Sequence, residues 1–127
     1  MRTTTGRLPE INRQIRGHAF YPPAKTLKAI PALYATEDTP MPDKTVHLHY
    51  FATWGDIWIT EINPETMEAY GFGMIGHSDP AYGDWGYYDL PAYESLAPDM
   101  RRSRWVMERD LHFTPAPARD VLPAGSL

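Results

Sequence analysis

The chain of 127 residues contains no cysteine. This absence excludes a disulfide framework, a thiolate nucleophile and a cysteine-ligated metal or iron–sulfur centre. Long hydrophobic runs are also missing: no stretch approaches the roughly 18 apolar residues of a membrane span, and the segment Met1 to Ile15 lacks the apolar centre of a signal peptide. These absences predict a soluble cytoplasmic protein that has no membrane association and no bound cofactor.

Basic residues are absent from the middle of the chain. Between Thr45 and Ala97 there is no lysine or arginine, but there are eight aspartates and glutamates, a balance that repels phosphate. Residues 1–28 carry six basic residues and one acidic residue, a net +5, which leaves −9 for the rest of a chain whose total is −4. This arm either contacts nucleic acid weakly or remains a solvated tail, and the sequence favours the tail. Its candidate contact residues are Arg2, Arg7, Arg13 and Arg16.

Length and composition indicate one globular domain. Hydrophobic residues make up 43% of the chain and charged residues 22%, which is ordinary globular usage. The 13 prolines and their neighbouring turn residues mark the boundaries. They predict a basic N-terminal extension over residues 1–26, a domain over 27–118 and a C-terminal tail over 119–127. Within the extension, residues 1–20 lack apolar periodicity and are expected to be dispensable for folding.

Alternating apolar residues predict an antiparallel meander. The expected strands run over 45–52, 57–62, 67–75, 85–89 and 105–113, and Pro91 favours a short helix that begins near Leu90. Bulges or close backbone approach are expected at Gly71 and Gly73. The predicted fold is a single α+β domain with an antiparallel sheet of four or five strands and one or two short helices.

Several blocks of the sequence resemble a known family. They are Ile30-Pro-Ala-Leu-Tyr-Ala-Thr-Glu37, Trp58-Ile-Thr-Glu61, Trp85-Gly-Tyr-Tyr-Asp-Leu with Tyr93-Glu94-Ser-Leu, and Met107-Glu-Arg-Asp-Leu-His-Phe113. Together they are similar to a family of small domains of unknown function that bacterial plasmids, conjugative elements and phages carry. The resemblance covers roughly residues 27–117. The resemblance implies an accessory role in a mobile element, for example as part of an anti-defence protein. It does not imply any particular reaction.

Two histidines form the best candidate for a metal site. His47 and His49 are alternate residues of a predicted strand, so both imidazoles lie on one face about 7 Å apart. A third ligand would come from His112, Glu61, Asp56 or His77, and no spacing selects one of them. The alternative, which the sequence favours, is a pair of histidines on a solvated sheet face.

Acidic residues form the second candidate. Glu61, Glu108 and Asp110 are the alternative catalytic set for acid–base hydrolysis, with metal assistance from the histidines. The favoured interpretation is a structural ion-pair network, in which Arg109 pairs with Glu37, Glu61 or Glu94. No nucleophile elbow, phosphate loop or dinucleotide fingerprint occurs in the sequence. An enzyme is therefore not favoured.

Aromatic residues on the expected strands form the third candidate. Because the middle of the chain is acidic, these aromatics favour contact with a protein of the host or the element over base stacking. The predicted binding residues are Glu37, Trp58, Glu61, Trp85, Glu108, Arg109 and Asp110. The sequence therefore predicts a protein-binding accessory factor, with a small hydrolase as the first alternative and a nucleic-acid binder as the second.

Overall fold

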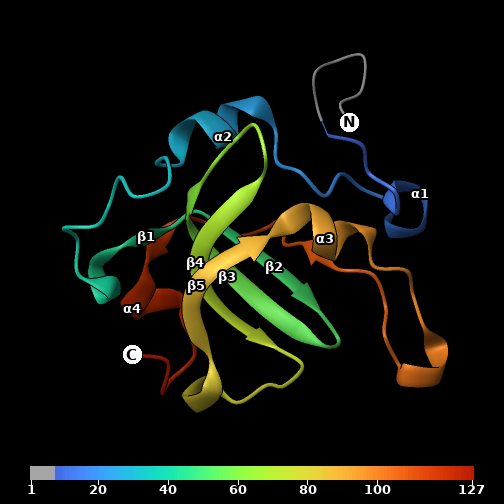
Figure 1. The fold of residues 1–127 in the computed structure, drawn as a ribbon. Helices are drawn as coiled ribbons and strands as arrows, with labels where there is room; N and C mark the ends of the chain where they lie inside the picture. The colour runs from blue at the N-terminus through green and yellow to red at the C-terminus, as the bar shows by residue number, and fades with distance from the viewer. Residues whose placement is uncertain (1–7) are drawn as a thin grey trace.

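The computed structural model describes residues 8–127, which form a five-stranded antiparallel sheet, a two-stranded sheet and four short helices (Figure 1). The strands are β1 (Thr45–Val46), β2 (Leu48–Ala52), β3 (Gly55–Ile62), β4 (Glu68–Ile75), β5 (Asp84–Asp89), β6 (Glu108–Arg109) and β7 (Ala116–Pro117). The helices are α1 (Arg13–Arg16), α2 (Ala24–Ala29), α3 (Leu90–Ser95) and α4 (Ala118–Val121). The predicted α+β class with an antiparallel sheet is confirmed. None of the helices within residues 8–127 has the length and apolarity to cross a bilayer.

The main sheet has the strand order β5-β4-β3-β2-β6, and every neighbouring pair is antiparallel. Strands β2 to β5 form the expected meander. The last strand is much shorter than the predicted range 105–113, because only Glu108 and Arg109 pair with β2. The carboxylate of Asp110 then accepts the backbone N–H of His112 at 3.0 Å, a local turn that ends the strand.

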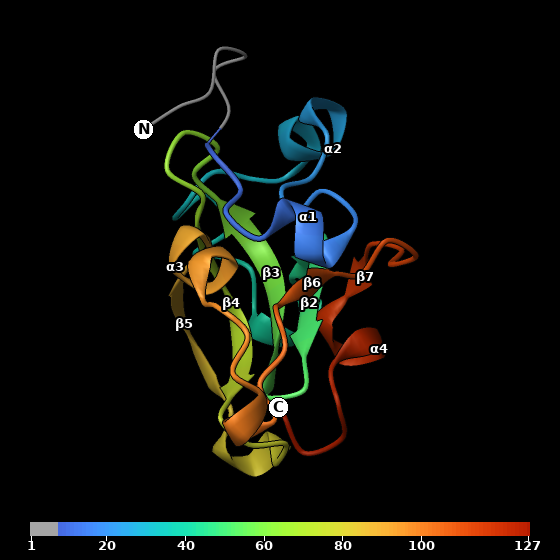
Figure 2. The same cartoon turned by 90° about the vertical axis from the view of Figure 1, so that its right-hand side faces the viewer.

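Two apolar clusters cover opposite faces of this sheet. On the first face, Tyr50, Ile57 and Ile59 pack with Phe20 and with Leu90 of α3. The second face is formed by a smaller cluster of five buried residues. They are Val46, Trp58, Phe72, Met74 and Ala118. In Figure 1 the strands accordingly lie between α4 and α3, and Figure 2 shows them from the side of α3.

The predicted strand 45–52 is broken at His47. Val46 belongs to the cluster on the second face, whereas Leu48 packs into the cluster on the first face, so the prediction of one continuous strand over 45–52 is wrong. The physical reason is that β1 leaves the main sheet and pairs with β7, with Val46 opposite Ala116.

A β-bulge in β3 changes the face on which Glu61 lies. Ile59 pairs with Gly71, but Glu61 pairs with Tyr70, the residue adjacent to Gly71, so Thr60 is the extra residue. A Cβ atom on Gly71 would lie 1.8 Å from the carbonyl oxygen of Trp58, which confirms the close backbone approach expected at this glycine. Because a bulge reverses the alternation of side chains, Glu61 joins Trp58 on the second face instead of Ile57 and Ile59 on the first.

The part of the predicted N-terminal extension that the structure describes is packed into the domain. Phe20 is fully buried and Tyr21 nearly so, and the hydroxyl of Tyr50 donates to the carbonyl of Phe20 at 2.8 Å. Arg2 and Arg7 lie outside the described residues. The structure thus differs from the boundary drawn at residue 26, because isolated aromatic residues, without helical or strand periodicity, contribute to the core.

Arg16 and Glu94 join this segment to α3 inside the core. Their side chains are 0% and 2% exposed and their charged groups lie 2.9 Å apart. Glu94 also accepts the backbone N–H groups of Ile11 and Asn12, at 2.7 and 2.9 Å. Arg16 Nε donates to the carbonyl of Met107 at 2.7 Å. One buried ion pair therefore ties three distant segments together.

The predicted C-terminal tail is also partly packed. Ala118 is fully buried on the second face, and Val121 and Leu122 pack against the same cluster. The N–H of Ala118 donates to the carbonyl of Lys44 at 2.8 Å. Helix α4 thus belongs to the domain, because its apolar side completes the smaller cluster.

Replacing Arg16 with alanine is expected to reduce the free energy of unfolding by about 3 to 5 kcal/mol, because Glu94 would remain buried without its counter-ion. Chemical denaturation monitored by tryptophan fluorescence measures this change. The matched control is Arg13→Ala, which removes an exposed arginine of the same helix and should cost less than about 1 kcal/mol. Equal losses for the two variants would contradict a role of Arg16 in the core.

Candidate functional site

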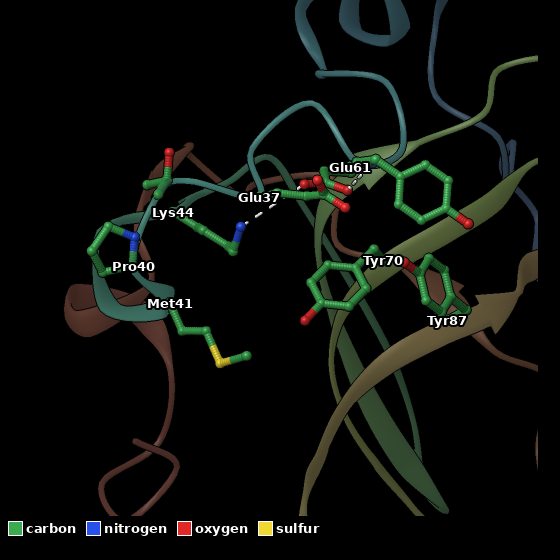
Figure 3. Close-up of a pocket in the computed structure, with 9 residues that line it drawn as sticks. Glu37, Pro40, Met41, Lys44, Glu61, Tyr70 and Tyr87 are labelled. Atoms are coloured by element: carbon green, nitrogen blue, oxygen red, sulfur yellow. Dashed lines mark hydrogen bonds and ion pairs between the residues drawn. The ribbon is translucent and has the colours of Figure 1, made fainter.

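A pocket of about 470 Å³ opens on the second face of the sheet (Figure 3). We call it the tyrosine pocket, after Tyr34, Tyr70 and Tyr87, which line it. The remaining lining residues are Glu37, Thr39, Pro40, Met41, Lys44 and Glu61. In Figure 3 the side chains of Pro40, Met41 and Lys44 lie across the pocket from Tyr70 and Tyr87. Its volume falls in the range of small-ligand sites, about 300 to 1,000 Å³.

Glu61 holds the loop that forms one wall of the pocket. The carboxylate is almost fully buried and accepts the backbone N–H groups of Tyr34 and Thr36 at 2.7 and 3.1 Å, as well as the hydroxyl of Thr36. A buried carboxylate needs such donors to offset its lost hydration. The resemblance blocks Leu-Tyr-Ala-Thr-Glu and Trp-Ile-Thr-Glu are therefore joined directly by hydrogen bonds.

Lys44 neutralises Glu61. Its side chain is 6% exposed, and Nζ lies 3.9 Å from the Glu61 carboxylate. The ammonium donates to the hydroxyl of Thr36 at 2.8 Å and to the Thr36 carbonyl, and it lies 5.9 Å from the ring centroid of Tyr70. An ammonium has three N–H donors, and Thr36 accepts two of them. Lys44 is thus a buried structural cation whose charge is compensated by Glu61.

Tyr34 has a backbone conformation that is unusual for its residue type. Its φ angle is +72°, in the left-handed region that glycine adopts without strain. The hydrogen bond from its N–H to Glu61 holds this conformation. Its side chain is 58% exposed, and its ring centroid lies 5.8 Å from that of Tyr87. The residue with the strained backbone is therefore also the one that places an exposed aromatic ring at the mouth of the pocket.

The other two rings are fixed by the sheet. Tyr70 and Tyr87 are direct partners across β4 and β5, and their centroids are 5.1 Å apart. Burial and then the negative charge of Glu61 raise the pKa of Tyr70, so its phenol stays neutral near pH 7. Next to these rings, Glu37 is exposed, and within residues 8–127 its carboxylate has no hydrogen-bond or ion-pair partner. The pocket therefore combines neutral aromatic faces with one free negative charge.

His49 forms a second polar cluster on this face. Its two ring nitrogens lie 2.8 Å from the Asp56 carboxylate and 3.1 Å from the Asp110 carboxylate, and the ring stacks on Trp58 with centroids 4.9 Å apart. Burial of the imidazole lowers its pKa, but the hydrogen bonds to both aspartates and their charges outweigh that effect and raise the pKa of His49 above its ordinary value of 6.5. A protonated imidazole between two carboxylates is an internal ion pair.

Glu37 and Glu61 both line the tyrosine pocket, but the two candidate metal ligands lie at separate places. His47 is half-buried between β1 and β2, beside Lys44 and Thr60 and away from the partners of His49, and burial lowers the pKa of His47. Within residues 8–127 no group of three histidine, aspartate or glutamate side chains is arranged to hold a metal ion. The alternative in which His47 and His49 converge on one ion is therefore not found in this part of the chain.

The residues of the Glu-Arg-Asp block have separate partners. Glu108 lies 3.1 Å from His18, and Asp110 contacts His49. Arg109 donates from Nε to the carbonyl of Ala19 at 3.3 Å. In the described chain it forms no ion pair with Glu37, Glu61 or Glu94, so its predicted pairing is wrong. Glu94 pairs instead with Arg16, and Glu61 pairs with Lys44. Both cations are buried beside their carboxylates, whereas Arg109 pairs with neither carboxylate in the part of the chain that the structure describes.

The predicted tryptophans contribute to packing more than to an open surface. Trp58 is 6% exposed within the second cluster, and Trp85 is half-buried against Phe72, with ring centroids 5.8 Å apart. The predicted binding residues did not include Tyr34, Tyr70, Tyr87 or Lys44, which line the pocket. One signal for Lys44 exists in the sequence, because it is the single basic residue between residues 29 and 97, among eleven acids. That isolation is typical of a lysine paired within the fold.

Comparisons with family models, curated proteins and solved structures found no match to this chain. The resemblance to small domains of mobile elements thus stays a prediction. The class that the structure itself defines is a small α+β domain with an aromatic and acidic pocket on one sheet face.

The raised pKa of His49 makes stability depend on pH. Since the folded protein holds the His49 proton more tightly than the unfolded chain, this stabilisation is complete below pH 6.5 and is lost as pH rises through the raised pKa. On the acid side, burial opposes the shift, but hydrogen bonds from His49 and His112 lower the pKa of Asp110 below its ordinary 3.8. Its contribution is complete above that value and is lost as pH falls through the lowered pKa.

We therefore expect the stability difference between the parent protein and His49→Gln to be largest between about pH 4 and 6.5 and to decrease towards pH 8.5. Denaturant unfolding at each pH measures it. The control is His77→Gln, which alters an exposed histidine. The same pH profile for both variants would show that His49 carries no coupled proton.

Proposed function

We propose that this protein is a protein-binding module that recognises a basic segment of a partner at the tyrosine pocket. The observation that carries the proposal is the charge distribution around the pocket. Between residues 29 and 97 the chain has eleven acids and one basic residue, Lys44, and Lys44 is buried against Glu61. Asp43, Glu61 and Glu94 pair with Arg119, Lys44 and Arg16. Glu37 and Asp38 are exposed at or beside the pocket, so a partner that approaches the pocket meets net negative charge, which accelerates association with basic segments and disfavours acidic ones.

The exposed aromatic residues support a binding role. Tyr34 and Tyr87 are 58% and 47% exposed at the pocket. Burial of their apolar ring area would stabilise an isolated domain, so their exposure favours a role in binding. Tyrosine is enriched at protein interfaces because its ring is large, rigid and amphipathic. The pocket thus offers anchoring area as well as charge.

The alternative functions have less structural support. A hydrolase needs its acid and base in one cleft, but Glu61, Glu108 and Asp110 have different partners. For nucleic-acid binding through the basic arm, Arg16 is not available as a contact residue, because its side chain is 0% exposed. An accessory role in a mobile element, including anti-defence activity, rests on the sequence resemblance and remains part of the proposal.

A selection of displayed random peptides against the whole protein tests this function. We expect the enriched peptides to carry net positive charge, because only such segments complement the acidic surface. They should bind Tyr87→Leu at least about tenfold more weakly than the parent protein, since an aromatic anchor contributes at least about 1.4 kcal/mol, measured by isothermal titration. An empty selection, enriched peptides without net positive charge, or undiminished binding to Tyr87→Leu would overturn the proposal.

A second variant separates binding from folding. Tyr34→Gly removes the exposed ring at a position where glycine adopts the observed positive φ without strain. We expect its denaturation midpoint to be no lower than that of the parent, whereas peptide affinity should fall. A stable variant with unchanged affinity would show that Tyr34 serves only the loop.

A further inference from the structure

We infer that the tyrosine pocket binds one arginine side chain, whose guanidinium lies against the tyrosine rings and pairs with Glu37. The inference rests on the proposed function and specifies the chemistry of the basic segment. Three features of the pocket carry it: its net charge, the shape of its aromatic wall and the free carboxylate of Glu37.

The charge of the pocket selects a cation. Three charged groups line it, Glu37, Glu61 and Lys44, and they sum to −1. Because Glu61 and Lys44 neutralise each other, the free charge belongs to Glu37. An anionic ligand would have to pair with Lys44, but the Lys44 side chain is 6% exposed and its charge is already compensated by Glu61. Two of its N–H groups also donate to Thr36.

The aromatic wall favours a flat cation. Tyr70 and Tyr87 have centroids 5.1 Å apart with planes inclined at 57°, and Tyr34 extends this wall on the side of Tyr87. The ammonium of Lys44 already lies 5.9 Å from the Tyr70 centroid, which shows that this ring accepts a cation within the fold. A guanidinium is planar and stacks on an aromatic ring, whereas an ammonium is compact and more strongly hydrated. Arginine therefore uses the exposed faces of Tyr34 and Tyr87 better than lysine does.

Glu37 gives the pocket its specificity for a guanidinium. A carboxylate without partners accepts two parallel N–H groups from arginine, which an ammonium does not offer in that geometry. Asp38, the next residue, is also exposed but does not line the pocket. The two neighbours therefore make a matched pair of acids, one inside the site and one outside it.

The strained backbone of Tyr34 agrees with a clamp for a ligand. A non-glycine residue at positive φ persists only where its surroundings hold it, and such residues concentrate at ligand clamps. Here Glu61 accepts the N–H of Tyr34, so a contact within the protein itself holds the loop in this conformation. The ring is thus pre-positioned, which lowers the entropic cost of binding.

Titration with single amino-acid amides tests the inference. The probes are Nα-acetyl-arginine amide, Nα-acetyl-lysine amide and Nα-acetyl-citrulline amide, and the readout is the ring signals of the pocket tyrosines in NMR spectra. We expect arginine amide to shift these signals with an affinity at least about fivefold above those of the lysine and citrulline amides. Citrulline keeps the shape of arginine without its charge, and lysine keeps the charge without the planar fork.

Matched variants locate the charge. Glu37→Gln should reduce the arginine affinity to that of citrulline amide, whereas Asp38→Asn should leave it unchanged within about twofold. Any of four results would overturn the inference. They are equal affinities for the arginine and lysine amides, equal affinities for the arginine and citrulline amides, equal effects of the two variants, and no shift of the tyrosine signals. The peptide selection decides the proposed function separately, because basic peptides that need Tyr87 but tolerate lysine in place of arginine would sustain the function and reject the arginine site.

Discussion

The requirement that a buried carboxylate be surrounded by hydrogen-bond donors organises this fold. Glu61 and Glu94 are 3% and 1% exposed, and each is satisfied by two backbone N–H groups and one cation from distant parts of the chain. Taking an unpaired carboxylate out of water costs several kcal/mol. Each glutamate therefore fixes a segment that has no regular structure of its own: the N-terminal segment at Glu94 and the loop around Tyr34 at Glu61.

These internal ion pairs also determine the charge of the surface. Lys44 is withdrawn to neutralise Glu61, and residues 45–97, which form most of the sheet, contribute no lysine or arginine to the surface. The loop held by Glu61 carries Tyr34 and Glu37 to the edge of the tyrosine pocket. The same interaction that stabilises the loop thereby creates a pocket with aromatic faces and a free carboxylate. Stability and the proposed recognition of basic segments thus depend on one buried network.

Much of the sheet was predictable because its strands have local patterns. The segments 57–62, 67–75 and 85–89 alternate or are rich in β-forming residues, and Pro91 marks the start of α3 with Asp89 as its cap. Three features were not predictable, although a bulge or close backbone approach was expected at Gly71 in the neighbouring strand β4. The break at His47 follows from pairing of β1 with β7, the bulge at Thr60 follows from the close approach of Gly71 to Trp58, and the shortness of β6 follows from the turn at Asp110. Each depends on a contact between residues distant in sequence or on backbone geometry that periodicity does not record.

By itself, the sequence determined the α+β class, the meander, the absence of cysteine chemistry and the acidic character of residues 45–97. These properties follow from composition and local periodicity. Only the tertiary structure decided which face Glu61 occupies, which cations pair with Glu61 and Glu94, and that Tyr34, Tyr70 and Tyr87 meet beside Glu37. The physical reason is that desolvation and pairing energies act between side chains that folding brings together. A one-residue bulge in β3 is enough to move a carboxylate from one side of the sheet to the other.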